Sequence, residues 1–200
     1  MTVRSRAKWL MAAFALWGMV SLQSWAQTYP AKPVRLVVPF PAGGATDIFA
    51  RALSQKLVQT LNTPVIIDNR PGAGGTLGSD VVAKSNADGY TLLLATSSTH
   101  TIAPLFNAHL PYDAVRDFTP IVHVGNAPNI MLVPNTSPAR TVKEWIAYAK
   151  ANPGKMNHAT AGMGSATHLA MAYFCGLAGI DLVHVPLKAT GEAINEVIPG

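Results

Sequence analysis

The chain has 200 residues, of which 49% are hydrophobic, 15 are basic and 10 are acidic. Subtracting the three cations near the N-terminus, Arg4, Arg6 and Lys8, from the formal net charge of +5 leaves +2 for the rest of the sequence. The other cations are scattered singly, which excludes a basic patch of the kind that binds nucleic acid. Low charge together with many apolar and small residues fits a compact α/β protein.

The N-terminal residues predict export. The three cations precede an apolar stretch over residues 9–22, which is short for a membrane span. Small residues follow at Ser24 and Ala26, the two positions that a signal peptidase reads. This pattern predicts a signal peptide over residues 1–26, cleaved after Ala26, and places the protein in the periplasm of a Gram-negative cell. The alternative is a segment that stays attached as an N-terminal anchor helix.

Strands and helices alternate along the next part of the chain. An apolar, β-branched run at residues 34–38 predicts a strand, and the pattern of residues 48–61 predicts a helix. A second strand at 65–68, a short helix around 79–85 and a third strand at 91–95 follow, and the last strand ends in a polar loop at 96–100. This alternation is typical of parallel βαβ units.

The loop between the first strand and the first helix, PFPAGGATD, has the composition of an anion site. Gly43 and Gly44 can take backbone angles closed to other residues and let a ligand approach the main chain. Thr46 or Asp47 is expected to cap the helix, whose first N–H groups have no intrahelical partners and attract negative charge. The alternative is a plain turn, in which the glycines only reverse the chain and Asp47 only caps the helix.

The second half of the chain repeats the strand–loop–helix design. Two β-rich runs, at 121–124 and 130–133, flank the sequence GNAP, which we interpret as a crossing between two lobes. Thr141 and Glu144 form a capping box at the start of a helix that is expected to reach residue 151. The remaining predicted elements are a strand at 156–160, a loop of small and hydroxylated residues, a helix at 168–177, a strand at 182–185 and a helix at 191–197.

No residue pattern predicts a metal or a cofactor. The six histidines are dispersed, without an HxxxH or HxH pair beside a carboxylate. Residues 72–75 lack the final glycine of a GxGxxG motif, and no GK[ST] follows. Cys175, the only cysteine, cannot form an intrachain disulfide and lies in an apolar helical stretch. An exported hydrolase is an alternative, because Ser165 and His168 lie at a helix start with the spacing of a nucleophile and a base, although a GxSxG elbow is absent from the sequence.

The chain resembles the Bug or TctC-type family, the periplasmic solute-binding receptors of tripartite tricarboxylate transporters. The resemblance rests on five motifs in order and spacing: PFPAGGATD, DNRPGAGGTLGSD, DGYTLLLATSSTH, LPYDAVRDFTPI and AGMGSATHLA. It implies a type II periplasmic binding-protein fold, with two α/β lobes, a hinge and a central ligand cleft. Lobe 1 is expected at residues 27–124 and lobe 2 at 125–200. Family members run longer, so we expect lobe 2 to be incomplete, with its C-terminal remainder missing.

The resemblance also implies a function without catalysis. The protein is expected to be a monomer that captures a small organic carboxylate and delivers it to the membrane subunits of a tripartite tricarboxylate transporter. The alternative within the same fold is a periplasmic sensor that feeds a signalling protein. In the family, loop amides, hydroxyls and ordered waters hold the carboxylate. The residues that the resemblance assigns to ligand binding are Phe40, Pro41, Gly43, Gly44, Thr46, Asp47, Ser98, Thr99, His100, Gly164, Ser165, Thr167 and His168.

Overall fold

The computed structural model describes residues 29–199, so the predicted signal peptide lies outside the described residues. The residues from Lys32 onward belong to one structural unit, and every contact discussed below lies inside it. This unit contains a three-stranded parallel sheet and, later in the chain, a two-stranded parallel sheet. Within residues 29–199, each helix is too short or too polar to cross a membrane.

The first sheet has the strand order β2–β1–β3. Its strands are β1 (Val34–Val38), β2 (Val65–Asn69) and β3 (Thr91–Leu93). The central strand β1 forms a hydrophobic cluster with both neighbours and with the helix that follows it, built on Leu36, Val38, Ala50 and Leu94. Burial on both faces explains why β1 has a continuous apolar sequence instead of an alternating one.

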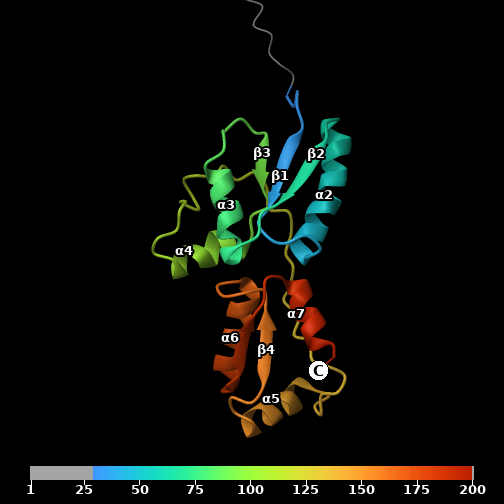
Figure 1. Cartoon of the computed structure of the whole chain (residues 1–200), viewed down its shortest axis with the longest axis vertical. Helices are drawn as coiled ribbons and strands as arrows, with labels where there is room; N and C mark the ends of the chain where they lie inside the picture. The colour runs from blue at the N-terminus through green and yellow to red at the C-terminus, as the bar shows by residue number, and fades with distance from the viewer. Residues whose placement is uncertain (1–28, 200) are drawn as a thin grey trace, which may run out of the picture. The chain divides into compact units, whose positions relative to one another are not determined.

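Two helices connect these strands, α2 (Ala45–Leu61) and α3 (Thr76–Ala83). The first connection runs from β1 to β2 on one side of it. The second connection runs from β2 back past β1 to β3, on the other side. Right-handed crossovers then require the two helices to cover opposite faces of the sheet. Figure 1 shows α2 and α3 on opposite sides of the strands. The short turn η1 (Ala73–Gly75) leads into α3.

The predicted start of the first helix is wrong. The helix α2 begins at Ala45, and its N-cap is Gly44, which has no capping side chain. Thr46 and Asp47 therefore lie inside the first turn, and neither is the N-cap. The error has a physical reason, since the first turn consists of small and polar residues that carry no apolar periodicity. For the same reason α3 and α6 (Ala166–Ala178) begin earlier than predicted.

The segment after β3 is also different from the prediction. Residues 96–100 were expected to form a polar loop, but the chain turns into η2 (Ser98–Ile102), a helical turn of the π type, and then α4 (Ala103–Phe106). The N–H groups of Thr99 and His100 both donate to the Thr96 carbonyl, at 3.1 Å. Hydroxyl-bearing residues favour such local bonding, which closes the turn.

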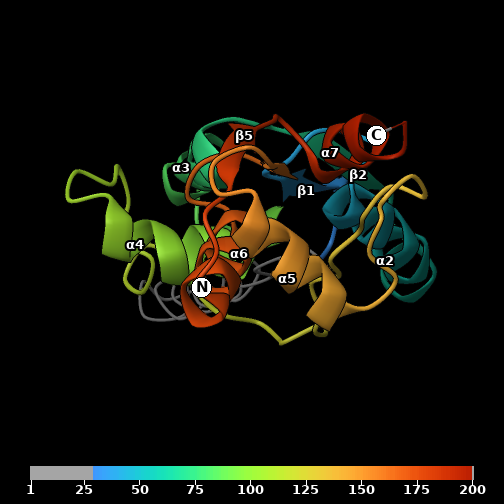
Figure 2. The same cartoon turned by 90° about the horizontal axis from the view of Figure 1, so that it is seen from below.

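The second sheet pairs β4 (Asn157–Thr160) with β5 (Val183–Pro186). The helix α6 connects the two strands, while α5 (Val142–Ala151) and α7 (Thr190–Val197) precede and follow them. Figure 2 shows α5 beside α6, where the rings of Trp145 and Phe174 have centroids 6.1 Å apart. Trp145 also belongs to a second hydrophobic cluster, with Ala139 and Ala149. The predicted N-cap is confirmed, since Thr141 Oγ1 accepts the Glu144 N–H at 3.2 Å. The return bond differs from that of a capping box, because Glu144 Oε2 accepts the N–H of Arg140, at 2.8 Å, instead of that of Thr141.

The predicted strands at 121–124 and 130–133 are not formed. Residues 119–134 have no strand assignment. Ile121 and Ile130 are 75% and 78% exposed. A β-branched sequence favours extended backbone, but a strand also needs a partner for its N–H and C=O groups. Within residues 29–199 these two runs have none.

Candidate functional site

The first predicted binding loop follows β1 and ends at the N-terminus of α2. Gly43 has a φ of +80°, in the left-handed region, whereas Gly44 has an ordinary φ of −76°. Only Gly43 therefore uses the conformational freedom expected of both glycines. The Gly44 N–H donates to the Pro41 carbonyl at 3.4 Å. The backbone thus reverses direction within the loop and turns directly into α2.

Asp47 holds this loop in place. Its side chain is 2% exposed, and its Oδ2 accepts the Gly43 N–H and Arg51 Nε–H, both at 2.9 Å. Its Oδ1 accepts a hydrogen bond from Asn69 Nδ2 at 2.9 Å. We refer to these three contacts as the Asp47 clamp. Mainly because of Arg51, and despite burial, the pKa of Asp47 falls to about 2, with Gly43 and Asn69 lowering it further.

Asn69 was missed in the sequence analysis. Its Nδ2 also donates to the Phe40 carbonyl at 3.1 Å, so one side chain reaches both ends of the loop. Asn69 is the last residue of β2 and pairs in register with Val38, the last residue of β1. A polar residue at the carboxyl end of a parallel strand lies at the edge where ligands bind in such sheets. That position was the signal that could have identified it.

The glycine-rich turn η1 packs between the predicted loops. A Cβ added to Gly75, whose φ is +96°, would lie 2.6 Å from Thr99 Cγ2 and 3.3 Å from the Phe40 ring. A Cβ added to Gly74 would lie 3.5 Å from the carbonyl oxygen of Met163, in the second predicted loop. The absence of a side chain at Gly75 therefore lets η1 approach Thr99 and Phe40 closely, whereas a Cβ at Gly74 would make only an ordinary van der Waals contact with Met163.

The turn η2, which follows β3, contains the predicted site residues Thr99 and His100. Thr99 is fully buried, and its carbonyl accepts a hydrogen bond from the Tyr112 hydroxyl at 2.7 Å. The His100 ring packs edge-on against Phe118, with centroids 4.6 Å apart. Burial lowers the pKa of His100 below its usual value.

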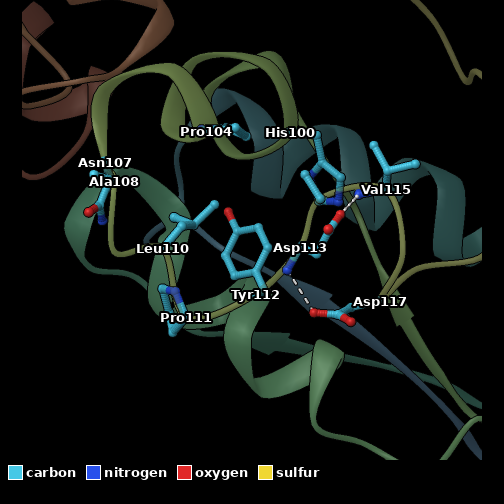
Figure 3. Close-up of a pocket in the computed structure, with 11 residues that line it drawn as sticks. His100, Pro104, Asn107, Ala108, Leu110, Pro111, Tyr112, Asp113, Val115 and Asp117 are labelled. Carbon is cyan, nitrogen blue, oxygen red and sulfur yellow. Dashed lines mark hydrogen bonds between the residues drawn. The ribbon is translucent and has the colours of Figure 1, made fainter.

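His100 also lines a cavity of about 600 Å³. Figure 3 shows His100 and Tyr112 in this cavity, together with Asp113, whose N–H donates to Asp117 at 2.7 Å. The rest of the lining comes from residues 104–117. His100 is the only predicted site residue among those that line it, so this cavity is distinct from the predicted loops.

The second predicted loop leads into α6. Ser165 is the N-cap: its Oγ accepts the His168 N–H at 3.2 Å and donates to the Gly162 carbonyl at 2.7 Å. Thr167 Oγ1 lies 3.0 Å from the same Ser165 oxygen and accepts the Ala161 N–H. His168 Nδ1 accepts the Gly164 N–H at 3.3 Å. Hydroxyls and one imidazole nitrogen thus fix the loop backbone.

These bonds do not form a nucleophile–base pair. The Ser165 hydroxyl donates to a carbonyl, and it meets the backbone N–H of His168, not its ring. The ring nitrogen that faces the loop, Nδ1, accepts from Gly164 instead. A hydrolase of the kind considered above needs the histidine ring to accept the serine proton. In residues 29–199, groups of three or more His, Cys, Asp or Glu side chains suited to a metal ion are also absent.

One hydrogen bond joins the two predicted loop regions. Ser98 Oγ, on η2, accepts the N–H of Ala166, the first residue of α6, at 3.0 Å. Ser98 is 4% exposed, so this bond is shielded from water. Of the thirteen predicted site residues, Ser98 on η2 thus lies against the start of α6, beside the loop that holds Ser165 and Thr167. Their contact with a ligand remains a prediction.

Comparison with known proteins relates this arrangement to one family. Residues 49–200 match the family described as "Tripartite tricarboxylate transporter family receptor". The protein BugT of Bordetella pertussis is 39% identical over 176 residues, which is 88% of this chain and 54% of BugT.

Two solved structures from Rhodopseudomonas palustris are similar in fold. Rpa4515 with adipate has 32% identity and a TM-score of 0.82, covering 84% of this chain and 56% of its own. MatC with bound malate has 33% identity and a TM-score of 0.78, covering 84% and 57%. The predicted α/β periplasmic binding-protein fold is confirmed by these likenesses. The chain spans about half the length of these proteins.

Proposed function

Because this chain belongs to the family of tripartite tricarboxylate transporter receptors, we propose that it is a periplasmic solute-binding protein that captures a small organic carboxylate. It delivers this ligand to the membrane subunits of a tripartite tricarboxylate transporter. The family and the fold are those of binding receptors, not enzymes. The proposal includes export through the signal peptide, a monomeric state, and two lobes, at 27–124 and 125–200, that close on the ligand.

The observation that carries the proposal is the hydrogen bond between Ser98 Oγ and the Ala166 N–H. It brings the carboxyl edge of the first sheet against the N-terminus of α6. The first N–H groups of a helix carry partial positive charge and attract anions. The Ser98 oxygen takes at this helix the place that a carboxylate oxygen would take. A carboxylate that takes this N–H in place of Ser98 Oγ is held by residues from both predicted lobes.

The start of α2 supports the same function. The first intrahelical bond of α2 runs from the Ile48 N–H to the Gly44 carbonyl at 3.0 Å. The N–H groups of Ala45, Thr46 and Asp47 precede it and have no acceptor within the helix. The Asp47 carboxylate is already bonded to Gly43, Arg51 and Asn69. Its role in the proposal is therefore to position the loop, and the anion is held by backbone N–H groups.

The ligands of the two similar structures narrow the class of carboxylate that we propose for this chain. One of them was solved with adipate and the other with malate. Both ligands are small molecules with two carboxylates. A dicarboxylate suits a site with two separate helix N-termini, since each can receive one anionic group. We therefore propose a dicarboxylate as the ligand of this chain.

Calorimetric titration of the purified protein with malate, adipate, a tricarboxylate and an uncharged amide analogue tests the proposal. We expect saturable one-to-one binding of a carboxylate and none of the amide. Heat that continues after saturation, or formation of a product, would show an enzyme. Absence of binding by every carboxylate would overturn the proposed function.

Proline substitutions test the backbone N–H groups directly. Proline at the first position of a helix removes one N–H and is structurally favoured. The preceding residues, Gly44 and Ser165, both have the extended backbone that proline requires. Ala45→Pro is expected to weaken carboxylate binding by about 1.5–3 kcal/mol, or roughly tenfold to 150-fold. Ala166→Pro removes an N–H that Ser98 Oγ already occupies, so the carboxylate has that bond to displace and the expected loss is smaller, about 0.5–1.5 kcal/mol. Val142→Pro, at the first position of α5, is the matched control and should leave the affinity unchanged.

A further inference from the structure

Three histidine rings stack against the second predicted loop, although they are far apart in the sequence. His184 of β5 lies between the other two. Its ring centroid is 4.9 Å from that of His158 on β4 and 4.3 Å from that of His168 on α6, with interplanar angles of 22° and 20°. The parallel pairing of β4 and β5 explains one of the two ring contacts, because His158 and His184 are direct partners across the two strands. We refer to these rings as the histidine stack.

The backbone of the second loop is attached to this stack at two points. His184 Nε2 lies 2.7 Å from Thr160 Oγ1, and the same hydroxyl oxygen accepts the Gly162 N–H at 3.2 Å. Two residues further along, the Gly164 N–H donates to His168 Nδ1 at 3.3 Å. The conformation of the loop therefore depends on the hydrogen-bonding state of two stacked rings.

Only the neutral form of His168 supports the contact with Gly164. A nitrogen that accepts a hydrogen bond carries no proton, so Nδ1 is unprotonated in this arrangement. Protonation makes Nδ1 a donor, and it then faces another donor, the Gly164 N–H. At the other attachment point, the neutral His184 ring can accept the Thr160 hydroxyl proton or donate to Thr160 Oγ1 through Nε2, according to its tautomer, whereas the protonated ring can only donate. Acid therefore removes the accepting form of the ring at both attachment points.

The surroundings of the stack favour neutral rings. Burial lowers the pKa of His158, and the neighbouring His184 and His168 lower it further, against an opposing contribution from the Val183 backbone. Burial, followed by His168, lowers the pKa of His184. On the packed helix α7, Glu192 and Glu196 are exposed, and Glu192 accepts the Lys188 N–H. The charged groups that act on His158 and His184 are thus the histidines of the stack itself.

We propose that the histidine stack is a pH-sensitive support for the loop at residues 162–165. Its neutral rings hold the loop ready for a carboxylate, and acidification releases the loop and weakens capture. His168 and His184 are positioning residues in this scheme, because they act through Gly164 and Thr160. The binding part of the inference rests on the proposed function, whereas the effect on the loop does not.

The sign of the effect follows from proton linkage. His158 and His184, whose pKa values are lowered chiefly by burial, stabilise the folded arrangement above the ordinary histidine value of about 6.5, and this stability is lost as the pH falls through the lowered values. If one proton is coupled to capture, the affinity falls by up to about tenfold per pH unit below that point. A positive ring behind the loop would attract an anion, so Coulomb attraction alone predicts the opposite trend.

The experiment uses two variants that keep the hydrogen-bonding atom and remove the titration. In His168→Asn the side-chain oxygen can take the place of Nδ1 as acceptor, and in His184→Gln the amide can replace Nε2. His109→Asn, at an exposed histidine outside the stack, is the matched control. The affinity for malate and for adipate is measured from about pH 8 to pH 5. Dividing each variant's affinity by that of the unmodified protein at the same pH removes the protonation of the ligand itself.

A second measurement does not depend on any ligand. The NMR signals of the Gly164 amide and of the histidine rings are followed over the same pH range. We expect the Gly164 amide to titrate together with the ring signals in the unmodified protein and in His109→Asn, and to be flat in His168→Asn. If the Gly164 amide signal of the unmodified protein does not change over the pH range in which the rings titrate, the inference is overturned. This result does not depend on whether a variant folds well.

The two measurements separate the inference from the proposed function. Affinity that falls with acid, and falls less in His168→Asn and His184→Gln, supports both. Affinity that is independent of pH or rises with acid overturns the inference and leaves the proposed function standing. If neither dicarboxylate binds at any pH, binding of this ligand class is refuted, while the Gly164 titration still decides whether the stack controls the loop.

Discussion

Replacing Asp47 by asparagine removes the charge from the Asp47 clamp while keeping the size of the side chain. The pKa of Asp47 is lowered from 3.8 to about 2, chiefly by Arg51. That difference corresponds to about 2 kcal/mol of stability carried by the charged form. Arg51 is 55% exposed, so solvent screening reduces its share, and we expect a loss of about 1–2 kcal/mol at neutral pH. The melting temperature should fall by roughly 2–8 °C.

The pH dependence identifies the cause of this loss. A carboxyl group whose pKa is lowered on folding contributes stability above its ordinary pKa, and that stability is lost as the pH falls through the lowered value. Urea unfolding followed by circular dichroism, from about pH 7 down to pH 2.5, should therefore show a difference between the two proteins that shrinks with acid. Asp181→Asn, at an exposed carboxylate, is the matched control and should change the free energy of unfolding by less than about 0.5 kcal/mol.

Two results would refute this reasoning about Asp47. A loss that stays constant from neutral to acid pH would mean that shape or neutral hydrogen bonding, not charge, holds the loop. No loss at neutral pH would mean that the three contacts of the clamp contribute no net stability. Either result would also weaken the positioning role that we assign to Asp47 in the proposed function.

Two further predictions concern the same edge of the first sheet. Gly43→Ala should lower the free energy of unfolding by about 1–2 kcal/mol, because a φ of +80° is strained for any other residue. Gly44→Ala should leave the free energy of unfolding in urea nearly unchanged, since the φ of Gly44 is ordinary and the added Cβ would lie 3.4 Å from the Pro41 oxygen. Equal losses of stability in the two variants would contradict this explanation. Tyr112→Phe should cost about 1–3 kcal/mol in the same assay, because it leaves the buried Thr99 carbonyl without its 2.7 Å bond, and an unchanged stability would show that this bond is replaced.

Much of the fold was predictable because local sequence patterns determine many of its strands and helices. The strand at 34–38 has the bounds that its apolar run predicted, and the N-cap at Thr141 was predicted from two residues, Thr141 and Glu144. Helix starts were less predictable, since small and polar first turns such as Ala-Thr-Asp in α2 lack the periodicity that marks the helix interior. The runs at 121–124 and 130–133 show the limit of propensity, because pairing depends on residues elsewhere in the chain.

The predicted loops were found by composition, but their internal contacts were not. Two glycines in succession looked equivalent in the sequence, and only the structure shows that Gly43 alone has a positive φ. Asn69 and Asp47 are brought together by the parallel pairing of β1 with β2, which a spacing motif does not record. The histidine stack was missed for the same reason, because its members come from two paired strands and a helix.

The contacts of the histidine stack also favour the observed alignment of β4 with β5. In β5, Val183 and Val185 are 46% and 36% exposed, while His184 points into the stack. Hydrophobicity alone would turn the two valines inward, which a shift of one residue would achieve. That shift would move His184 to the opposite face and break its contacts with His158, His168 and Thr160. The contacts of the three rings therefore favour this register of β4 and β5 over the shifted one. The NMR signals of the histidine rings, which the pH experiment follows, also report whether these two short strands are paired in this register.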